Sequence, residues 1–183
     1  MLKELERALN RQGDRLTKDV KRAIKKKDLV VSGALYDSVR YELEEVGEGK
    51  YVMSFYMLEH GYYQDEGVKG ANPSAVRVNG KAGRQKAPRS KFQFGKMTGK
   101  GSLFKALDNW IVRKGIAPRN RRGQFMSRQS LRYAMTKSIY YQGIEPKEFF
   151  TPVWDKWNKR VPDVLKDALS KDVEKLWLEF VNV

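Results

Sequence analysis

The residues of this chain that could do chemistry are mainly cations, and they are concentrated in its middle. Residues 67–144 hold 18 lysines and arginines and one acid, Asp108, a net charge of +17. The whole 183-residue chain has a net charge of +15, so residues 1–66 and 145–183 together carry 19 basic against 21 acidic residues. So many like charges repel one another unless a polyanion, salt or an acidic neighbouring subunit neutralises them. The middle of the chain is therefore expected to bind an acidic partner, with nucleic acid as the first candidate.

Eight of these cations are the best candidates for contact with DNA or with an acidic neighbour, because they crowd into predicted loops without acids between them. They are Arg77, Lys81, Arg84, Lys86, Arg89, Arg119, Arg121 and Arg122. No zinc-finger spacing, RNP sequence or convincing helix-turn-helix accompanies them. Contact with nucleic acid is therefore expected to involve the phosphate backbone and to be independent of sequence, with an affinity that falls steeply as salt rises.

Side chains that catalyse reactions or bind transition metals are scarce. The chain has one histidine, His60, and no cysteine, which removes thiolate catalysis, disulfides and zinc–thiolate sites. Asp65 and Glu66, close to Lys69, are similar in type to the carboxylates and lysine of a nuclease, but their spacing is loose and a structural role is favoured. A metal-dependent nuclease is therefore the least favoured alternative, and no catalytic residue or metal site is predicted.

A glycine-rich stretch, residues 95–102, resembles a phosphate-binding loop. The motif requires four residues between its glycines and Ser or Thr directly after its lysine. Here three residues separate Gly95 from Gly99, and Gly101 follows Lys100. ATP binding is therefore not expected, and no cofactor is predicted.

Periodicity predicts the elements that position the basic region. Apolar residues recur at helical spacing over residues 2–27, which predicts an amphipathic helix that Gly13 weakens or bends. Alternating apolar residues from Tyr51 to Met57 predict a strand of a β-hairpin whose turn lies at Gly47–Lys50. Residues 71–101 lack periodicity and predict a long loop with short strands around 75–78 and 92–94.

Three further helices are predicted after this loop. An apolar face from Leu103 to Ile111 predicts the first, and Ser127 or Ser130 is expected to start the second, which Gly143 ends. Pro162 and Asp163 are expected to open the last helix. No apolar run approaches the roughly 20 residues that cross a bilayer, and no signal peptide is apparent, so no membrane partner is expected.

These patterns predict an α+β protein with one domain, residues 1–183. A small antiparallel sheet, built on the β-hairpin, is flanked by N- and C-terminal helices, and residues 71–142 form a basic insertion of loops and helices. Aromatic residues outside that insertion are expected to pack in the core or between subunits. They are Tyr62, Tyr63, Phe149, Phe150 and Trp154.

Three stretches, taken in order, resemble neck and tail-completion proteins of tailed bacteriophages. They are Ser32-Gly33-x-Leu35-x-Asp37-Ser38-Val39 after a helix, Tyr63-x-Asp65-x-Gly67-Val68-x-Gly70 after a hairpin, and Gly143-Ile144-x-Pro146-x-x-Phe149-Phe150-Thr151-Pro152 before the last helix. The resemblance covers residues 1–70 and 143–183, and residues 71–142 are longer than the usual connection in that family.

The resemblance implies a structural virion protein rather than an enzyme. Such subunits are small α+β proteins that form rings at the head–tail junction or at the end of the tail. The implied partners are copies of the chain itself, adjacent portal, neck or tail proteins, and packaged DNA; the implied location is the virion, after synthesis in the host bacterial cytoplasm. A sequence-independent nucleic-acid-binding protein that acts as a monomer or dimer is the main alternative.

Overall fold

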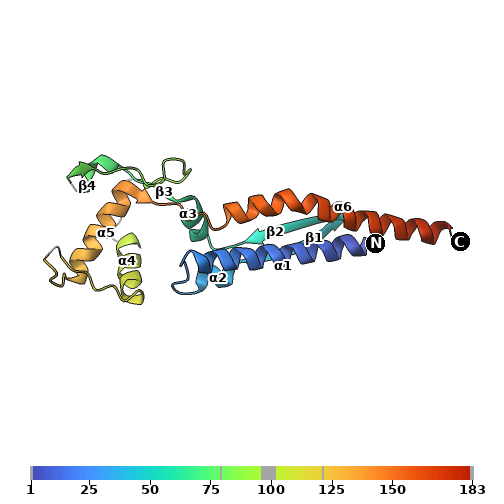
Figure 1. Cartoon of the computed structure of the whole chain (residues 1–183), viewed down its shortest axis with the longest axis horizontal. Coiled ribbons are helices and arrows are strands. Elements are labelled where there is room, and N and C mark those ends of the chain that lie inside the picture. The colour runs from blue at the N-terminus through green and yellow to red at the C-terminus, as the bar shows by residue number, and fades with distance from the viewer. Residues whose placement is uncertain (1, 79, 96–101, 121, 182–183) are drawn as a thin grey trace. The chain divides into compact units, whose positions relative to one another are not determined.

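The computed structural model describes residues 2–78, 80–95, 102–120 and 122–181 (Figure 1). Within these residues the chain forms six α-helices and three two-stranded antiparallel sheets, so the predicted α+β class is confirmed. The chain divides into two compact units. Met1–Leu58 with Phe149–Val183 forms the first, here named the scaffold unit, and Glu59–Glu148 forms the second, here named the basic unit.

The scaffold unit packs two long helices against a β-hairpin. The helices are α1 (Lys3–Lys26) and α6 (Thr151–Val181), the hairpin is β1 (Arg40–Gly47) with β2 (Lys50–Tyr56), and the short helix α2 (Ala34–Ser38) precedes it. The predicted first helix and the predicted hairpin are thereby confirmed. In the hairpin, Tyr41 lies opposite Phe55 and Leu43 opposite Met53, which places these four side chains on one face.

The core of the scaffold unit is closed by residues from both ends of the chain. Leu16, Val20 and Ile24 of α1 are buried together with Phe149, which has no exposed surface. Aromatic side chains of α6 then extend this core, since Trp154 stacks on Trp157 and both meet the ring of Phe55 edge-on. Of the aromatic residues predicted to pack, Phe150 and Trp154 also lie against this core.

The last helix begins earlier than the sequence predicted. Pro162 was expected to open it, but α6 starts at Thr151 and contains Pro162 in its interior. An interior proline removes one backbone hydrogen bond, which leaves the carbonyl of the residue four positions earlier without its donor. Both Pro162 and that residue, Asn158, are exposed, so water can satisfy the carbonyl. Packing of the Trp154 and Trp157 side chains on the core holds the preceding turns in the helix.

Gly13 has a packing role that the sequence did not reveal. A β-carbon at this position would lie 2.4 Å from the Cε2 atom of Tyr41, because the tyrosine ring covers the glycine. The Tyr41 hydroxyl holds the ring there by donating to the Asn10 carbonyl at 3.1 Å. The glycine therefore allows the hairpin to approach α1 closely, at the cost of helix propensity.

Gly13→Ala is expected to destabilise the protein, although alanine is the better helix former by about 1 kcal/mol. The clash with Tyr41 should lower the free energy of unfolding by about 1–3 kcal/mol, as overpacked cores do. Urea unfolding followed by circular dichroism measures this. In a Tyr41→Ala background the same substitution should become stabilising; a stabilising Gly13→Ala in the native background would contradict the role assigned to the ring.

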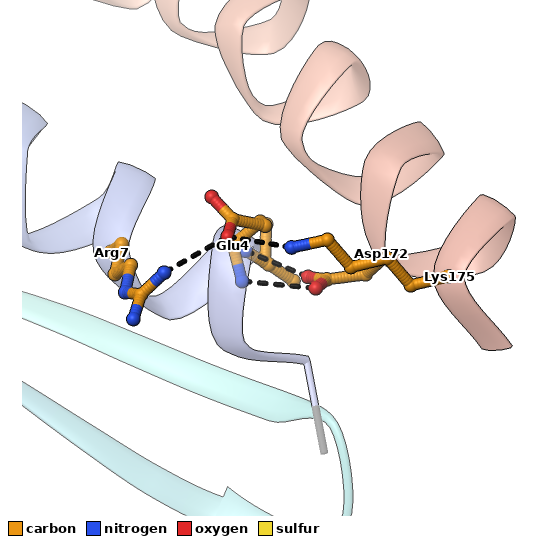
Figure 2. Close-up of polar contacts among 5 residues, drawn as sticks. Glu4, Arg7, Asp172 and Lys175 are labelled. Carbon is orange, nitrogen blue, oxygen red and sulfur yellow. Dashed lines mark hydrogen bonds and ion pairs between the residues drawn. The ribbon is translucent and has the colours of Figure 1, made fainter. Parts of the chain in front are cut away.

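The N-terminus of α1 is capped by a carboxylate from α6 (Figure 2). The Asp172 oxygens accept hydrogen bonds from the backbone N–H groups of Glu4 at 3.0 Å and Leu5 at 2.8 Å. The Lys175 ammonium and the Arg7 guanidinium each lie 2.9 Å from the Glu4 carboxylate. Burial raises the pKa of Asp172, but the two amide hydrogen bonds and the charge of Lys175 outweigh it, so the pKa lies below its ordinary value. Asp172 therefore favours the folded state when it is ionised.

Asp172→Asn is expected to lower the melting temperature at pH 7 by about 5 °C, because the ionised cap and its interaction with the helix N-terminus are lost. Since the folded pKa is depressed, the contribution of Asp172 is complete above the ordinary aspartate pKa of about 3.9 and disappears as pH falls through the folded value. The difference between native and variant proteins should therefore shrink in acid. Asp167→Asn, an exposed carboxylate on the same helix, is the control; equal melting temperatures for the two variants would contradict the capping role.

Candidate polyanion-binding surface

The basic unit is closed by a short pairing of its two ends. Strand β3 (Val68–Lys69) pairs antiparallel with β6 (Gly143–Ile144), so the unit extends beyond the predicted insertion at both ends. A β-carbon on Gly70 would lie 2.1 Å from the Tyr141 carbonyl oxygen, and one on Gly143 would lie 2.1 Å from that of Val68. Only glycine fits at these two positions. The helix α3 (His60–Glu66) precedes β3 in this unit.

Five of the predicted cations lie on one ordered segment, residues 77–89, of which residue 79 is outside the described part. The segment begins with the hairpin of β4 (Arg77–Val78) and β5 (Lys81–Ala82), which follows the short 3-10 helix η1 (Pro73–Ala75) (Figure 1). All five cations are exposed: Arg77, Lys81, Arg84, Lys86 and Arg89. The predicted strand near 75–78 is thus present, whereas the one near 92–94 is reduced to a single bridge between Gln93 and Lys69.

Hydrogen bonds hold this segment to the rest of the basic unit. The Gln85 amide binds both backbone groups of Gly70, accepting from its N–H at 2.6 Å and donating to its carbonyl at 3.2 Å. The Lys86 N–H donates to the Gln142 carbonyl at 2.9 Å, and the buried Ser90 hydroxyl donates to the Gly67 carbonyl at 2.7 Å. Gln85, between Arg84 and Lys86, and Ser90, directly after Arg89, therefore fix the backbone that carries the exposed cations.

Gln85 is the positioning residue that sequence reasoning missed. The only signal for it was the interleaving of small or polar residues with cations in the run from Lys81 to Lys91. That pattern predicts only a loop, since an amide that bonds to the backbone of another segment leaves no hydrophobic periodicity.

The five exposed cations of the 77–89 segment form no ion pair with any carboxylate of the described residues. Other cations of the unit are neutralised. Lys91 lies 2.7 Å from Glu66, while Arg128 and Arg132 share Asp108 at 3.1 and 3.2 Å. The single acid of residues 67–144 is thereby already engaged, which leaves the 77–89 segment as an uncompensated positive surface.

The remaining predicted cations belong to a different part of the unit. Arg119 and Arg122 are exposed on the turn between α4 (Ser102–Arg113) and α5 (Arg128–Gln142), and Arg121 lies outside the described residues. The guanidinium of Arg119 lies 3.9 Å from the centre of the Phe125 ring and donates to the Gly123 carbonyl at 2.9 Å.

The structure does not gather all the predicted cations into one cluster. The turn at Arg119 precedes the first residue of α5, whereas the 77–89 segment is bonded near the last residue of that helix (Figure 1). The predicted second helix of the pair, including its Ser127 cap, is confirmed by the hydrogen bond from the Ser130 N–H to the Ser127 hydroxyl at 3.1 Å.

The residues considered for catalysis differ in their surroundings. Asp65 is buried and Glu66 is paired with Lys91, while His60 is exposed. In the described ranges there is no group of three or more His, Cys, Asp or Glu side chains that could hold a metal ion. The stretch that resembles a phosphate-binding loop falls largely on residues 96–101, which lie outside the described part.

The two remaining aromatic candidates lie in the basic unit. Tyr63 packs edge-on against Phe92, with ring centres 4.7 Å apart, and its hydroxyl donates to the Glu59 carboxylate at 2.6 Å. This hydrogen bond raises the pKa of Tyr63, and partial burial adds to the shift. Tyr62 is exposed.

Comparisons with models of protein families, with curated proteins and with solved structures found no match to this chain. Among the described helices, none is long and apolar enough to cross a membrane. The chemistry of the surface itself is therefore the basis for assigning a function. A fixed backbone that presents guanidinium and ammonium groups without carboxylate partners suits repeated phosphate groups, because it needs little ordering on binding.

Proposed function

We propose that this chain is a structural, non-enzymatic virion protein of a tailed bacteriophage. Copies assemble head-to-tail into a ring at the head–tail junction or at the end of the tail. The basic unit then faces the DNA channel or an acidic neighbouring ring, and the 77–89 segment makes the principal contacts.

The observation that carries this proposal is the segregation of charge between the two units. The basic unit holds 19 basic and six acidic residues, whereas the scaffold unit holds 18 and 16. A nearly neutral scaffold can pack closely against copies of itself, since there is little net charge to repel them. A separate positive unit is then available for a polyanion.

The positions of the resembling stretches support the same proposal. Two of them supply glycines that lie very close to the backbone of another segment, namely Gly67 and Gly70 in one stretch and Gly143 in the other. The remaining stretch supplies Gly33, which has a positive φ of 83° and directly precedes α2. The stretches at 63–70 and 143–152 therefore meet through β3 and β6, and the third precedes the β1–β2 hairpin, so the architecture of a ring subunit would depend on all three.

A reconstruction of the assembled particle by electron cryo-microscopy tests the proposal. We expect a ring in which the basic unit contacts packaged DNA or an adjacent protein ring. A basic unit that points away from both would contradict the role assigned to its charge, and absence of the chain from the particle would contradict the whole proposal.

A nucleic-acid-binding protein without a ring is the second candidate, favoured by the exposed cations of the 77–89 segment. Light scattering with mass measurement, with and without the portal protein, distinguishes the two. A chain that stays monomeric in both conditions and still binds DNA tightly would favour this candidate. Cleavage of DNA in Mg²⁺ or Mn²⁺ that Asp65→Asn abolishes would instead indicate a nuclease.

A further inference from the structure

The C-terminal half of α6 carries an apolar stripe that its own scaffold unit leaves open. Leu169, Val173, Leu176 and Phe180 are 41, 56, 48 and 77% exposed. Their spacing of four, three and four residues is that of the seam between two packed helices. Isolated exposed apolar residues are common, but a continuous stripe of this kind marks an interaction surface.

This stripe is separate from the face that α6 uses inside its own unit. The buried residues of α6 are Val161, Ala168 and Asp172, and Asp172 meets the N-terminus of α1. At 100° per residue, the stripe is rotated by roughly 90° from that face. The helix also continues past the N-terminal end of α1, so α1 does not accompany its last turns (Figure 1).

The chemistry of the stripe selects a helix rather than a polyanion as its occupant. A shallow groove at one edge of the stripe is lined by Leu169 and Val173 of the stripe and by Trp177, Lys166, Ser170 and Glu174 beside it. The whole of α6 has six basic and six acidic residues, so it offers no net attraction to nucleic acid. A second copy of the same helix brings the matching spacing and no net charge to overcome.

Lys166 determines the orientation of such a pair. It lies three residues before Leu169, in line with the stripe. Parallel helices would place two Lys166 ammonium groups against each other, whereas antiparallel helices place each near the carboxyl end of the other helix, where the helix dipole favours a cation. The antiparallel register also sets Leu169 opposite Phe180 and Val173 opposite Leu176, which pairs larger with smaller side chains.

We propose that α6 pairs antiparallel with α6 of a second copy through Leu169, Val173, Leu176 and Phe180. The contact is isologous and closes at two chains, so it goes beyond the head-to-tail ring of the proposed function. Within a ring assembly it would join subunits of two facing rings; without a ring it makes the free chain a dimer.

Sedimentation equilibrium of the full-length protein tests the pairing with a matched pair of variants. Leu176→Glu is expected to raise the dissociation constant of the dimer at least about 100-fold, because two carboxylates would be buried in the seam without partners. Leu178→Glu is the control, since Leu178 is 52% exposed on the same helix but lies outside the stripe. Unchanged circular dichroism and melting of a dilute sample show that both variants fold.

The outcomes separate this inference from the proposed ring. A native chain that is monomeric at every concentration, or two variants that weaken association equally, would overturn the pairing. A ring whose mass Leu176→Glu leaves unchanged would also overturn the pairing but would uphold the ring. Paired rings that separate into single rings in Leu176→Glu would support both.

Engineered cysteines test the orientation, since the chain has no cysteine of its own. Leu169 and Phe180 lie about 16 Å apart along the helix axis at 1.5 Å per residue, which exceeds the reach of a disulfide. Leu169→Cys and Phe180→Cys proteins should therefore form a disulfide with each other when mixed and neither should form one alone. Disulfides within each single variant, or none in the mixture, would overturn the antiparallel register.

Discussion

Replacing the five cations of the 77–89 segment by glutamine is expected to reduce the salt dependence of DNA binding. The variant carries R77Q, K81Q, R84Q, K86Q and R89Q. If all five side chains meet phosphates, the slope of log affinity against log salt should become less steep by about 4 to 5. Over a fourfold rise in salt, the native protein should then lose on the order of several hundred-fold more affinity than the variant. Fluorescence anisotropy with a short double-stranded DNA measures both slopes.

A variant with the same net charge provides the control. It carries K18Q, K26Q, K156Q, K159Q and K171Q, all at exposed positions of the scaffold unit. Its slope should stay near that of the native protein, since these residues are not expected to meet phosphate. Equal losses in the two variants would indicate a general effect of charge. Two unchanged slopes would exclude DNA as the partner of the segment and leave an acidic protein.

Phe149→Ala is expected to destabilise the scaffold unit by about 3–5 kcal/mol. The Phe149 ring has no exposed surface, and it lies among Leu16, Val20 and Ile24. These neighbours come from one rigid helix, so they cannot collapse far into the space that the ring leaves. Urea unfolding followed by tryptophan fluorescence, which reports on Trp154 and Trp157 in the same core, measures the loss.

Phe125→Ala is the matched control for the core substitution. Phe125 is 68% exposed, so the loss should be within about 0.5 kcal/mol, as for other surface positions. Phe149→Leu should fall between the two, because it preserves most of the apolar volume. A Phe149→Ala protein as stable as Phe125→Ala would show that Phe149 does not hold the two ends of the chain together.

Helices and strands with a clear hydrophobic periodicity could be predicted from the sequence, whereas short strands that are paired by close backbone contacts could not. The α1 stripe and the alternation of β2 are each long enough to be read directly. Strands β3 and β6 have two residues each, so they carry no period. Their pairing depends on Gly70 and Gly143, because backbone atoms of the opposite segment lie too close to these residues for a side chain to fit. This proximity is visible only in the folded chain. The pairing of β3 with β6 therefore lies outside the predicted insertion, residues 71–142.

The residue types of the candidate surface could be predicted from the sequence, but which of the cations lie together could not. Composition alone identifies the excess of cations, yet the pairing of Arg128 and Arg132 with Asp108 requires the packing of α4 against α5. The separation of Arg119 from the 77–89 segment likewise follows from the length of α5. The start of α6 was missed because proline at a helix start is a local preference, and the packing of the partly buried Trp154 on the core outweighs it.

The discontinuous scaffold unit implies an order of events during synthesis. Helix α1, with its stripe of Leu16, Val20 and Ile24, is made before the basic unit, whereas Phe149 and α6 are made after it. At roughly 5–20 residues per second, the 90 residues of the basic unit delay them by about 5 to 18 s. At the end of that time the basic unit has all of its own strands and helices, while the apolar stripe of α1 has the hairpin beside it but still lacks Phe149 and α6. The nascent chain should therefore offer α1 to chaperones until its own C-terminal helix replaces them.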